Sequence, residues 1–188
     1  DLHLRTRQLD PDYAIDALAS GELDLAFTID YPHAPAPLRD DVTRYSLLDD
    51  ILYLVVREDD PLADQGRVRL ADLAPRPFIA SPSGMSCGRC VVAACRDAGF
   101  EPDLVHEVDD YPTTLHLVGA GQGVSLVPAL GLIDLAPHLR AKEVDPPVSR
   151  LVQLAYRKTS AERPAIVAVR QVLDEIVADL GLGRTMAA

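Results

Sequence analysis

Three cysteines lie close together in the middle of this chain, and their spacing is the arrangement in the sequence best suited to redox chemistry. Cys87 and Cys90 form a C-x-x-C pair at the predicted start of a helix, and Cys95 follows on the same helix. A helix N-terminus lowers the pKa of a thiol, which favours reversible oxidation. Zinc binding is disfavoured, because the cluster lacks a fourth ligand and a neighbouring histidine. The alternative is that Cys90 and Cys95 are small apolar side chains on the buried face of the helix.

A polar turn directly before these cysteines has the composition of an anion-binding site. Ser81, Ser83, Gly84 and Ser86 join a short predicted strand at 78–80 to the predicted helix. Hydroxyl groups and free amides at a helix N-terminus hold carboxylates well. The alternative is that these serines only cap the helix, and the sequence leaves both interpretations open.

Three glycines at 119, 121 and 123 invite comparison with a dinucleotide-binding loop, but their setting argues against it. In such a loop a strand runs into the glycines and a helix leaves them. Here an apolar helical pattern at 115–118 comes first, and a buried strand over 124–127 follows. The glycines therefore end a helix and turn the chain into a strand.

The histidines form no recognisable catalytic or metal-binding group. None stands at metal-ligand spacing, and none pairs with a serine or cysteine and an acid in a nucleophile motif. They are scattered along the chain at positions 3, 33, 106, 116 and 138. We therefore expect neither an enzyme nor a bound cofactor or metal.

Strand and helix patterns alternate along the chain, which predicts an α/β fold. The expected strands cover 2–8, 23–29, 45–48, 51–56, 78–80, 104–108, 124–127, 140–144 and 151–156. The expected helices cover 12–19, 87–98, the segment before Gly119, 130–135 and 164–180. Prolines at 75–77 and 146–147 interrupt the series twice. We therefore expect two subdomains, one of 1–74 with 149–188 and one of 75–148.

The composition restricts the partners that this chain can have. The formal net charge is −11, so DNA phosphates would repel it, and no helix-turn-helix pattern is visible. DNA binding therefore requires a segment outside this sequence. The apolar runs are too short to span a bilayer, and the first ten residues are too charged for a signal peptide. We expect a cytoplasmic protein that makes no membrane contact.

The string DDYPTTLHLVGAGQGVSLVP at 109–128 resembles the signature of the effector-binding domain of LysR-type transcriptional regulators. Four other strings resemble motifs of this family in the same order: LASGELDLAF at 18–27, DDPLA at 59–63, VRLADL at 68–73 and AGFEP at 98–102. The resemblance covers nearly the whole chain. It implies two Rossmann-like subdomains with a cleft between them, as in type-2 periplasmic binding proteins. It also implies that the first strand and helix of subdomain I, and a winged helix-turn-helix domain, precede Asp1.

The resemblance further implies that a small-molecule effector binds beyond the carboxyl ends of the strands, where ligands of open α/β sheets lie. The expected contacts are Asp10, Thr28, Ile29, Ser81, Ser83, Gly84, Ser86, Tyr111, Thr113, Val127 and Pro128. The chemistry of these side chains suits a small polar or carboxylate-bearing metabolite. Asp10 is the exception, because its carboxylate either caps its own helix or repels an anionic effector.

The family also implies a homodimer, and a tetramer in the full-length regulator. The helix over 12–19 would face the partner's helix over 87–98, which carries more apolar side chains, Val91 among them, than one buried face requires. Three alternatives remain open. They are a stand-alone solute-binding protein of the same fold, a thiol redox sensor that uses Cys87, Cys90 and Cys95, and an enzyme with this bilobal fold.

Overall fold

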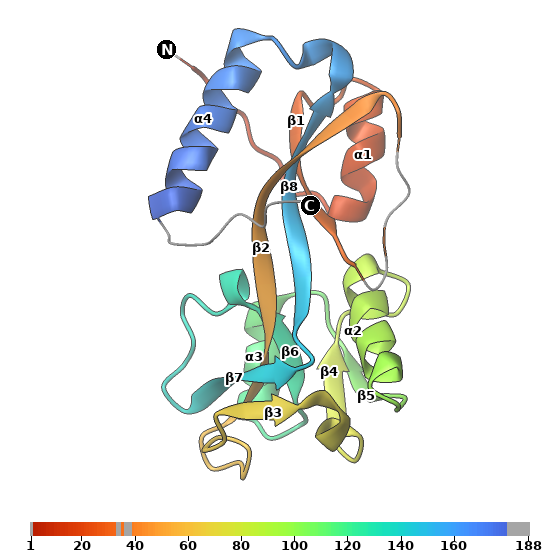
Figure 1. The fold of residues 1–188 in the computed structure, drawn as a ribbon, viewed down its shortest axis with the longest axis vertical. Coiled ribbons are helices and arrows are strands. Elements are labelled where there is room, and N and C mark those ends of the chain that lie inside the picture. Colours follow the sequence, from red (N-terminus) through yellow and green to blue (C-terminus); the bar gives the residue numbers. More distant parts are fainter. Residues whose placement is uncertain (1, 33–34, 36–38, 180–188) are drawn as a thin grey trace. The chain divides into compact units, whose positions relative to one another are not determined.

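The computed structural model of this chain describes residues 2–32, 35 and 39–179 as alternating helices and strands (Figure 1). The α/β class predicted from the sequence is confirmed. The chain divides into two compact units. Unit 1 comprises residues 1–30, 36–49 and 151–188, and unit 2 comprises residues 31–35 and 50–150.

The first boundary between the units differs from the expected one at 74–75. The segments 45–48 and 51–56 form one continuous strand, β2 (Val42–Arg57), rather than two strands. From Leu52 onward β2 pairs with strands of unit 2, and this pairing ties residues 50–74 to that unit. The second boundary lies at 150–151, two residues beyond the expected position.

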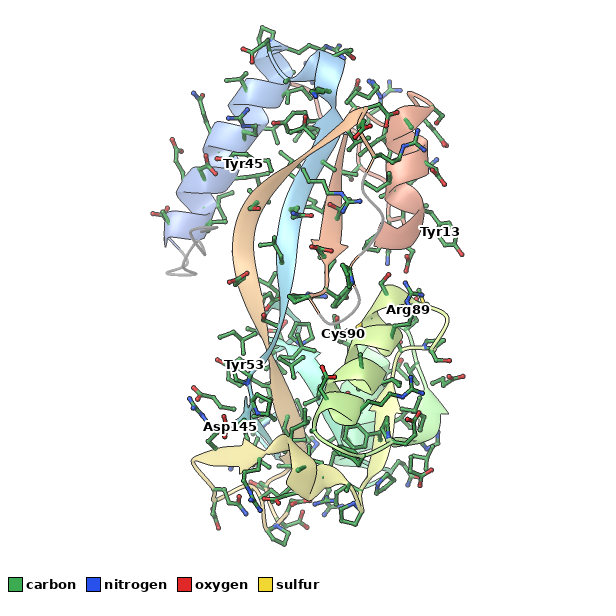
Figure 2. All side chains as sticks on the ribbon, turned by 45° about the vertical axis from the view of Figure 1, so that its right-hand side comes forward. Tyr13, Tyr45, Tyr53, Arg89, Cys90 and Asp145 are labelled. Carbon is green, nitrogen blue, oxygen red and sulfur yellow. The ribbon has the colours of Figure 1, made fainter. Side chains whose placement is uncertain are left out.

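Unit 1 is built on an antiparallel pair of strands, β1 (Leu25–Asp30) and β8 (Val148–Arg157), which lie opposite each other from Leu25 with Tyr156 to Asp30 with Leu151. Helix α1 (Pro11–Ala19) packs against β1, and Gly21 follows it with a φ of +83°, as a glycine that ends a helix does. A short helix, η3 (Lys158–Ser160), leads from β8 to helix α4 (Pro164–Asp179). The hydroxyl of Tyr45 donates to Asp174 Oδ2 of α4 at 2.8 Å, and Tyr45 faces this helix in Figure 2.

The expected strand over 2–8 is not formed. Residues 2–10 have no regular secondary structure, and Leu2 and Leu4 are 50% and 67% exposed. The paired neighbour of β1 is therefore the antiparallel β8, not a parallel strand of a βαβ unit. A strand needs a neighbour to satisfy its amides and carbonyls, and none of the described strands supplies one to residues 2–10.

Unit 2 contains most of the remaining elements. They are β3 (Arg67–Arg69), η1 (Leu70–Leu73), β4 (Pro77–Ala80), α2 (Ser86–Asp97), β5 (Asp103–Glu107), α3 (Tyr111–Gly119), β6 (Ser125–Pro128), η2 (Ala129–Gly131) and β7 (Leu139–Asp145). The second half of β2 pairs antiparallel with β6 and β7, β3 runs parallel to β7, and β4 runs parallel to β5. A core cluster packs between these elements and consists of Val55, Ile79, Val118, Val127 and Leu139.

Helices α2 and α3 are each followed by a glycine of positive φ, although Gly119, which was also expected to end its helix in this way, is the last residue of α3 and has no positive φ. Gly99 follows α2 with a φ of +92°, and Gly121 follows α3 with a φ of +75°, a conformation that costs glycine nothing. The expected excess of apolar side chains on α2 is wrong, because Val91 and Val92 are only 2% and 8% exposed and belong to the core. None of the helices within the described ranges is long and apolar enough to cross a membrane.

Candidate functional site

Residues 81–85 form the turn between β4 and α2, and this is the segment that the sequence predicts to be an anion-binding loop. Ser83 and Gly84 are exposed, Ser81 is half-buried and Ser86 is buried as the first residue of α2. Gly88 fixes the shape of this turn. A Cβ at that position would lie 2.3 Å from the carbonyl oxygens of Ser81 and Pro82, so the turn passes directly over the helix.

The start of α2 lacks the serine cap that was the alternative interpretation. Met85 occupies the N-cap position, and its side chain makes no capping hydrogen bond within the described chain. The amide of Ser83 instead donates to Oε1 of Glu107 at 3.4 Å. The guanidinium of Arg89, labelled in Figure 2, donates to the carbonyl of Gly84 and to the hydroxyl of Ser86, both at 2.6 Å. The turn thus already holds one carboxylate and positions a cation beside its serines.

The start of α3 lies next to the start of α2. Asp110 caps α3 by accepting from the amide of Thr113 at 3.0 Å, and the exposed side chain of Thr113 also hydrogen-bonds to Asp110. The hydroxyl of Tyr111 hydrogen-bonds to the thiol of Cys87, and so does the hydroxyl of Tyr31. Burial, and after it the neighbouring Cys87, raise the pKa of both tyrosines, so both stay neutral hydrogen-bond donors.

A buried ion pair supports this group, and the sequence analysis did not single it out. Arg150 Nε donates to Asp50 Oδ2 at 2.9 Å, and Arg150 Nη1 donates to the hydroxyl of Tyr111 at 3.0 Å. Burial alone would lower the pKa of Arg150, but Tyr111 and Asp50 raise it above its usual value. The amide of Leu130 donates to Asp50 Oδ1 at 3.1 Å. The sequence held one sign of this pair, because Asp50 and Arg150 are charged residues directly beside the apolar strand patterns at 51–56 and 151–156.

The other predicted residues of unit 2 lie on β6. Val127 is fully buried in the core cluster, and Pro128 is buried as well. Strand β6 pairs with β2 through Leu52 opposite Pro128 and Tyr53 opposite Val127. The structure therefore brings together the 81–86 turn, Tyr111 and Cys87, while the side chain of Val127 serves the core.

Three predicted contacts belong to unit 1. Asp10 directly precedes α1, and its carbonyl accepts from the amide of Tyr13 at 3.0 Å. Thr28 is 4% exposed, and its Oγ1 has no hydrogen-bond partner among the described residues. Ile29, which follows it on β1, is half-buried. Opposite Thr28 on β8 lies Gln153, 8% exposed, whose Oε1 likewise lacks a partner within the described chain. Sequence reasoning missed Gln153, because its pairing with Thr28 bridges distant segments.

The cysteines do not behave as a uniform redox group. Cys90 and Cys95 are fully buried, and burial is the main cause that raises the pKa of each thiol from its ordinary 9.0 to about 12. This favours the interpretation of both as small apolar helix residues. Cys87 is half-buried and receives the two tyrosine hydroxyls. Among the described residues, no group of three His, Cys, Asp or Glu side chains could hold a metal ion.

We expect a maleimide at about pH 8 to modify Cys87 alone in the folded protein, because a thiol with a pKa of about 12 has about a thousandfold less thiolate than an ordinary one. Mass spectrometry should find one label in buffer and three in denaturant, and Cys87→Ser should abolish labelling in buffer. Fast labelling of the folded Cys87→Ser variant would contradict the assignment.

The raised pKa values of Cys90 and Cys95 should also reduce the free energy of unfolding as the pH rises from about 9 towards 12. In this range the two thiols ionise in the unfolded chain before they ionise in the folded one.

Comparison of this sequence with known protein families identifies one match. The model of the LysR substrate binding domain matches residues 1–178. The transcriptional dual regulator GltC of Bacillus subtilis is 31% identical over 137 residues, which are 72% of this chain and 44% of that relative. The chain therefore spans less than half of the length of this relative.

Two solved structures of similar fold are effector-binding domains. The effector-binding domain of BenM with its effector benzoate has a TM-score of 0.76 and 24% identity, over 94% of this chain and 79% of that one. The effector-binding domain of QuiR in complex with shikimate has a TM-score of 0.76 and 20% identity, over 92% and 80%. At these identities the likeness shows a common fold.

Proposed function

Because this chain belongs to the LysR substrate-binding-domain family, we propose that it is the effector-sensing part of a LysR-type transcriptional regulator. The observation that carries the proposal is the open N-terminus of α2. Its turn offers backbone amides and serine hydroxyls, and one amide already meets the carboxylate of Glu107. Such a helix start is suited to bind an anionic group of a ligand.

The effector that we propose is a small carboxylate that also carries hydroxyl or amine groups. The carboxylate suits the 81–86 turn, and the polar groups suit the buried oxygens of Thr28 and Gln153, which have no partner within the described residues. A buried oxygen without a partner costs about 1–3 kcal/mol, so a ligand that satisfies it gains affinity. The BenM and QuiR domains are solved with benzoate and shikimate, which are both carboxylates.

Sensing then works by a shift between conformations. An effector that binds one conformation of the chain more tightly raises the population of that conformation. We propose that a DNA-binding segment outside this sequence reads the change, since a net charge of −11 opposes contact with DNA here. Homodimers, and tetramers of the whole regulator, are part of this proposal. Helix α1 suits the contact, because Tyr13 is 66% exposed and points away from the helix in Figure 2.

A thermal-shift screen of small carboxylates, with benzoate and shikimate included, tests the proposal. A compound that stabilises the chain should bind about fivefold more weakly to Thr28→Val and to Ser83→Ala, for a loss of about 1 kcal/mol per hydrogen bond. Gln153→Leu should reduce the affinity for hydroxylated compounds more than for benzoate.

Matched controls are Thr159→Val on η3 and Ser46→Ala on β2, two exposed positions in unit 1 that should leave binding unchanged. Unaltered affinity in both Thr28→Val and Ser83→Ala would refute the placement of the effector. The absence of any stabilising compound among anions, sugars and amines would count against sensing itself.

A further inference from the structure

Unit 2 contains a hollow that the proposed effector contacts do not account for. It has a volume of about 540 Å³ and lies between α3 and the segment 130–139. Tyr111 is its only lining residue among the expected effector contacts, and the 81–86 turn does not line it. Pockets of about 300–1,000 Å³ with mostly apolar walls and a few polar groups are typical of small-molecule sites.

The apolar wall is built around an aromatic ring. The ring of Tyr111 packs on Gly131, where an added Cβ would lie 3.0 Å from its Cδ2. Leu115 on α3 and Ile133 on the opposite segment belong to this wall. Other apolar side chains of the lining are Leu130, Ala136 and Leu139. Ile133 is 79% exposed and is therefore free to contact a ligand that enters the hollow. A flat ring stacked beside Tyr111 would cover it.

The polar lining selects the chemistry of the ligand. His116 Nδ1 lies 2.7 Å from the carbonyl oxygen of Pro112, and a carbonyl only accepts, so Nδ1 carries the proton. In the neutral ring Nε2 is then left as an acceptor. Asp134, also in the lining, is a second acceptor and repels anions, and a second histidine, His138, lies against Gly119, with its Nε2 2.7 Å from the position of an added Cβ there. The hollow therefore favours a ligand that donates hydrogen bonds, and the net charge of −11 acts in the same direction.

We propose that this hollow binds a small aromatic molecule that carries an N–H or O–H donor and no negative charge. The site goes beyond the proposed effector contacts, which favour a carboxylate. Hydrogen bonds also connect the hollow to the buried ion pair of Arg150 and Asp50. Tyr111 contributes its ring to the hollow and its hydroxyl to Arg150. Arg150 is paired with Asp50, and these two residues stand where the chain enters and leaves unit 2.

Calorimetric titration of the chain with indole, tryptamine and indole-3-acetate at about pH 8, where ordinary imidazoles are neutral, tests the proposal. Indole and tryptamine should bind, and indole-3-acetate should bind at least fivefold more weakly. His116→Leu and Ile133→Ser should each weaken indole binding about tenfold or more. Their matched controls are His106→Leu on β5 and Val172→Ser on α4, which lie outside the lining and should bind indole normally.

Three outcomes would overturn the assignment. The first is no binding of indole or tryptamine at millimolar concentration. The second is indole-3-acetate binding as tightly as indole, which would contradict the acceptor lining. The third is binding that survives Ile133→Ser and is lost in Thr28→Val, which would move the ligand to the effector contacts. If His116→Leu fails to fold, Ile133→Ser decides alone, because this exposed side chain can be removed without opening the core.

Discussion

Replacing Asp50 by alanine should lower the free energy of unfolding by about 3–5 kcal/mol. The change removes the partner of Arg150, whose side chain is only 11% exposed, and it leaves the amide of Leu130 without its acceptor. A buried charge that has lost its counter-ion is more costly than the pair is stabilising, because the desolvation of the remaining ion is no longer compensated. Urea unfolding followed by circular dichroism measures the loss. Domains of this size are stable by about 5–15 kcal/mol, so the variant should lose a large share of its stability.

An exposed pair supplies the control. Arg69 and Asp72 form an ion pair at 2.7 Å with side chains 75% and 42% exposed, so Asp72→Ala should change the stability by less than about 1 kcal/mol. The double variant Asp50→Leu with Arg150→Met should be more stable than Asp50→Ala, because it removes both charges and keeps the volume. A loss below about 1 kcal/mol in Asp50→Ala would mean that the pair is not structural.

Local patterns in the sequence predicted most of the helices and strands, because their causes lie within a few neighbouring residues. The apolar periodicity before Gly99 and Gly121 marks helices, and both glycines adopt the positive φ expected of a residue that ends one. Strands β4, β5, β6 and β7 begin and end within a residue or two of the predicted ranges. Each of these features follows from spacing and from glycine or proline boundaries alone.

The features that the sequence did not predict depend on partners far along the chain. The alternating pattern at 2–8 reads as a strand, yet no described strand pairs with it. Asp49 and Asp50 read as a break in β2, yet the strand continues because Arg150, 100 residues later, neutralises Asp50. A local sequence pattern indicates only whether a residue is apolar enough to be buried. Whether a buried charge is tolerated depends on a partner of opposite charge, which can lie far along the chain.

The candidate site divides in the same way. The 81–86 turn could be singled out because a helix start is a local motif, and Tyr111 because the string at 109–128 resembles a family signature. Gln153 could not, since its polarity matters only through its position opposite Thr28. The hollow beside α3 also depends on two distant segments, α3 and 130–139, and none of the local patterns reports a volume.

Replacing Gly88 by alanine should disturb the proposed effector site more than any single change within the 81–86 turn. The added methyl group would lie 2.3 Å from two backbone oxygens, those of Ser81 and Pro82. Backbone atoms cannot rotate away as a side chain does, so the turn and α2 have to separate. Forced packing of this kind costs about 1–3 kcal/mol. We expect that loss in urea unfolding, together with at least tenfold weaker binding of the carboxylate found by thermal shift.

Gly66→Ala is the matched control, because a Cβ at Gly66 would meet no atom of the described residues within 4 Å. Its stability should stay within about 0.5 kcal/mol of the unmodified chain, and its affinity for the carboxylate should not change. The comparison separates the steric contact made by the methyl group at position 88 from the loss of a flexible glycine, since both variants add the same methyl group and lose a glycine. Normal carboxylate binding by a folded Gly88→Ala variant would show that the effector does not use the turn at the start of α2. In that case the buried oxygens of Thr28 and Gln153 would be the remaining contacts to examine for the same ligand.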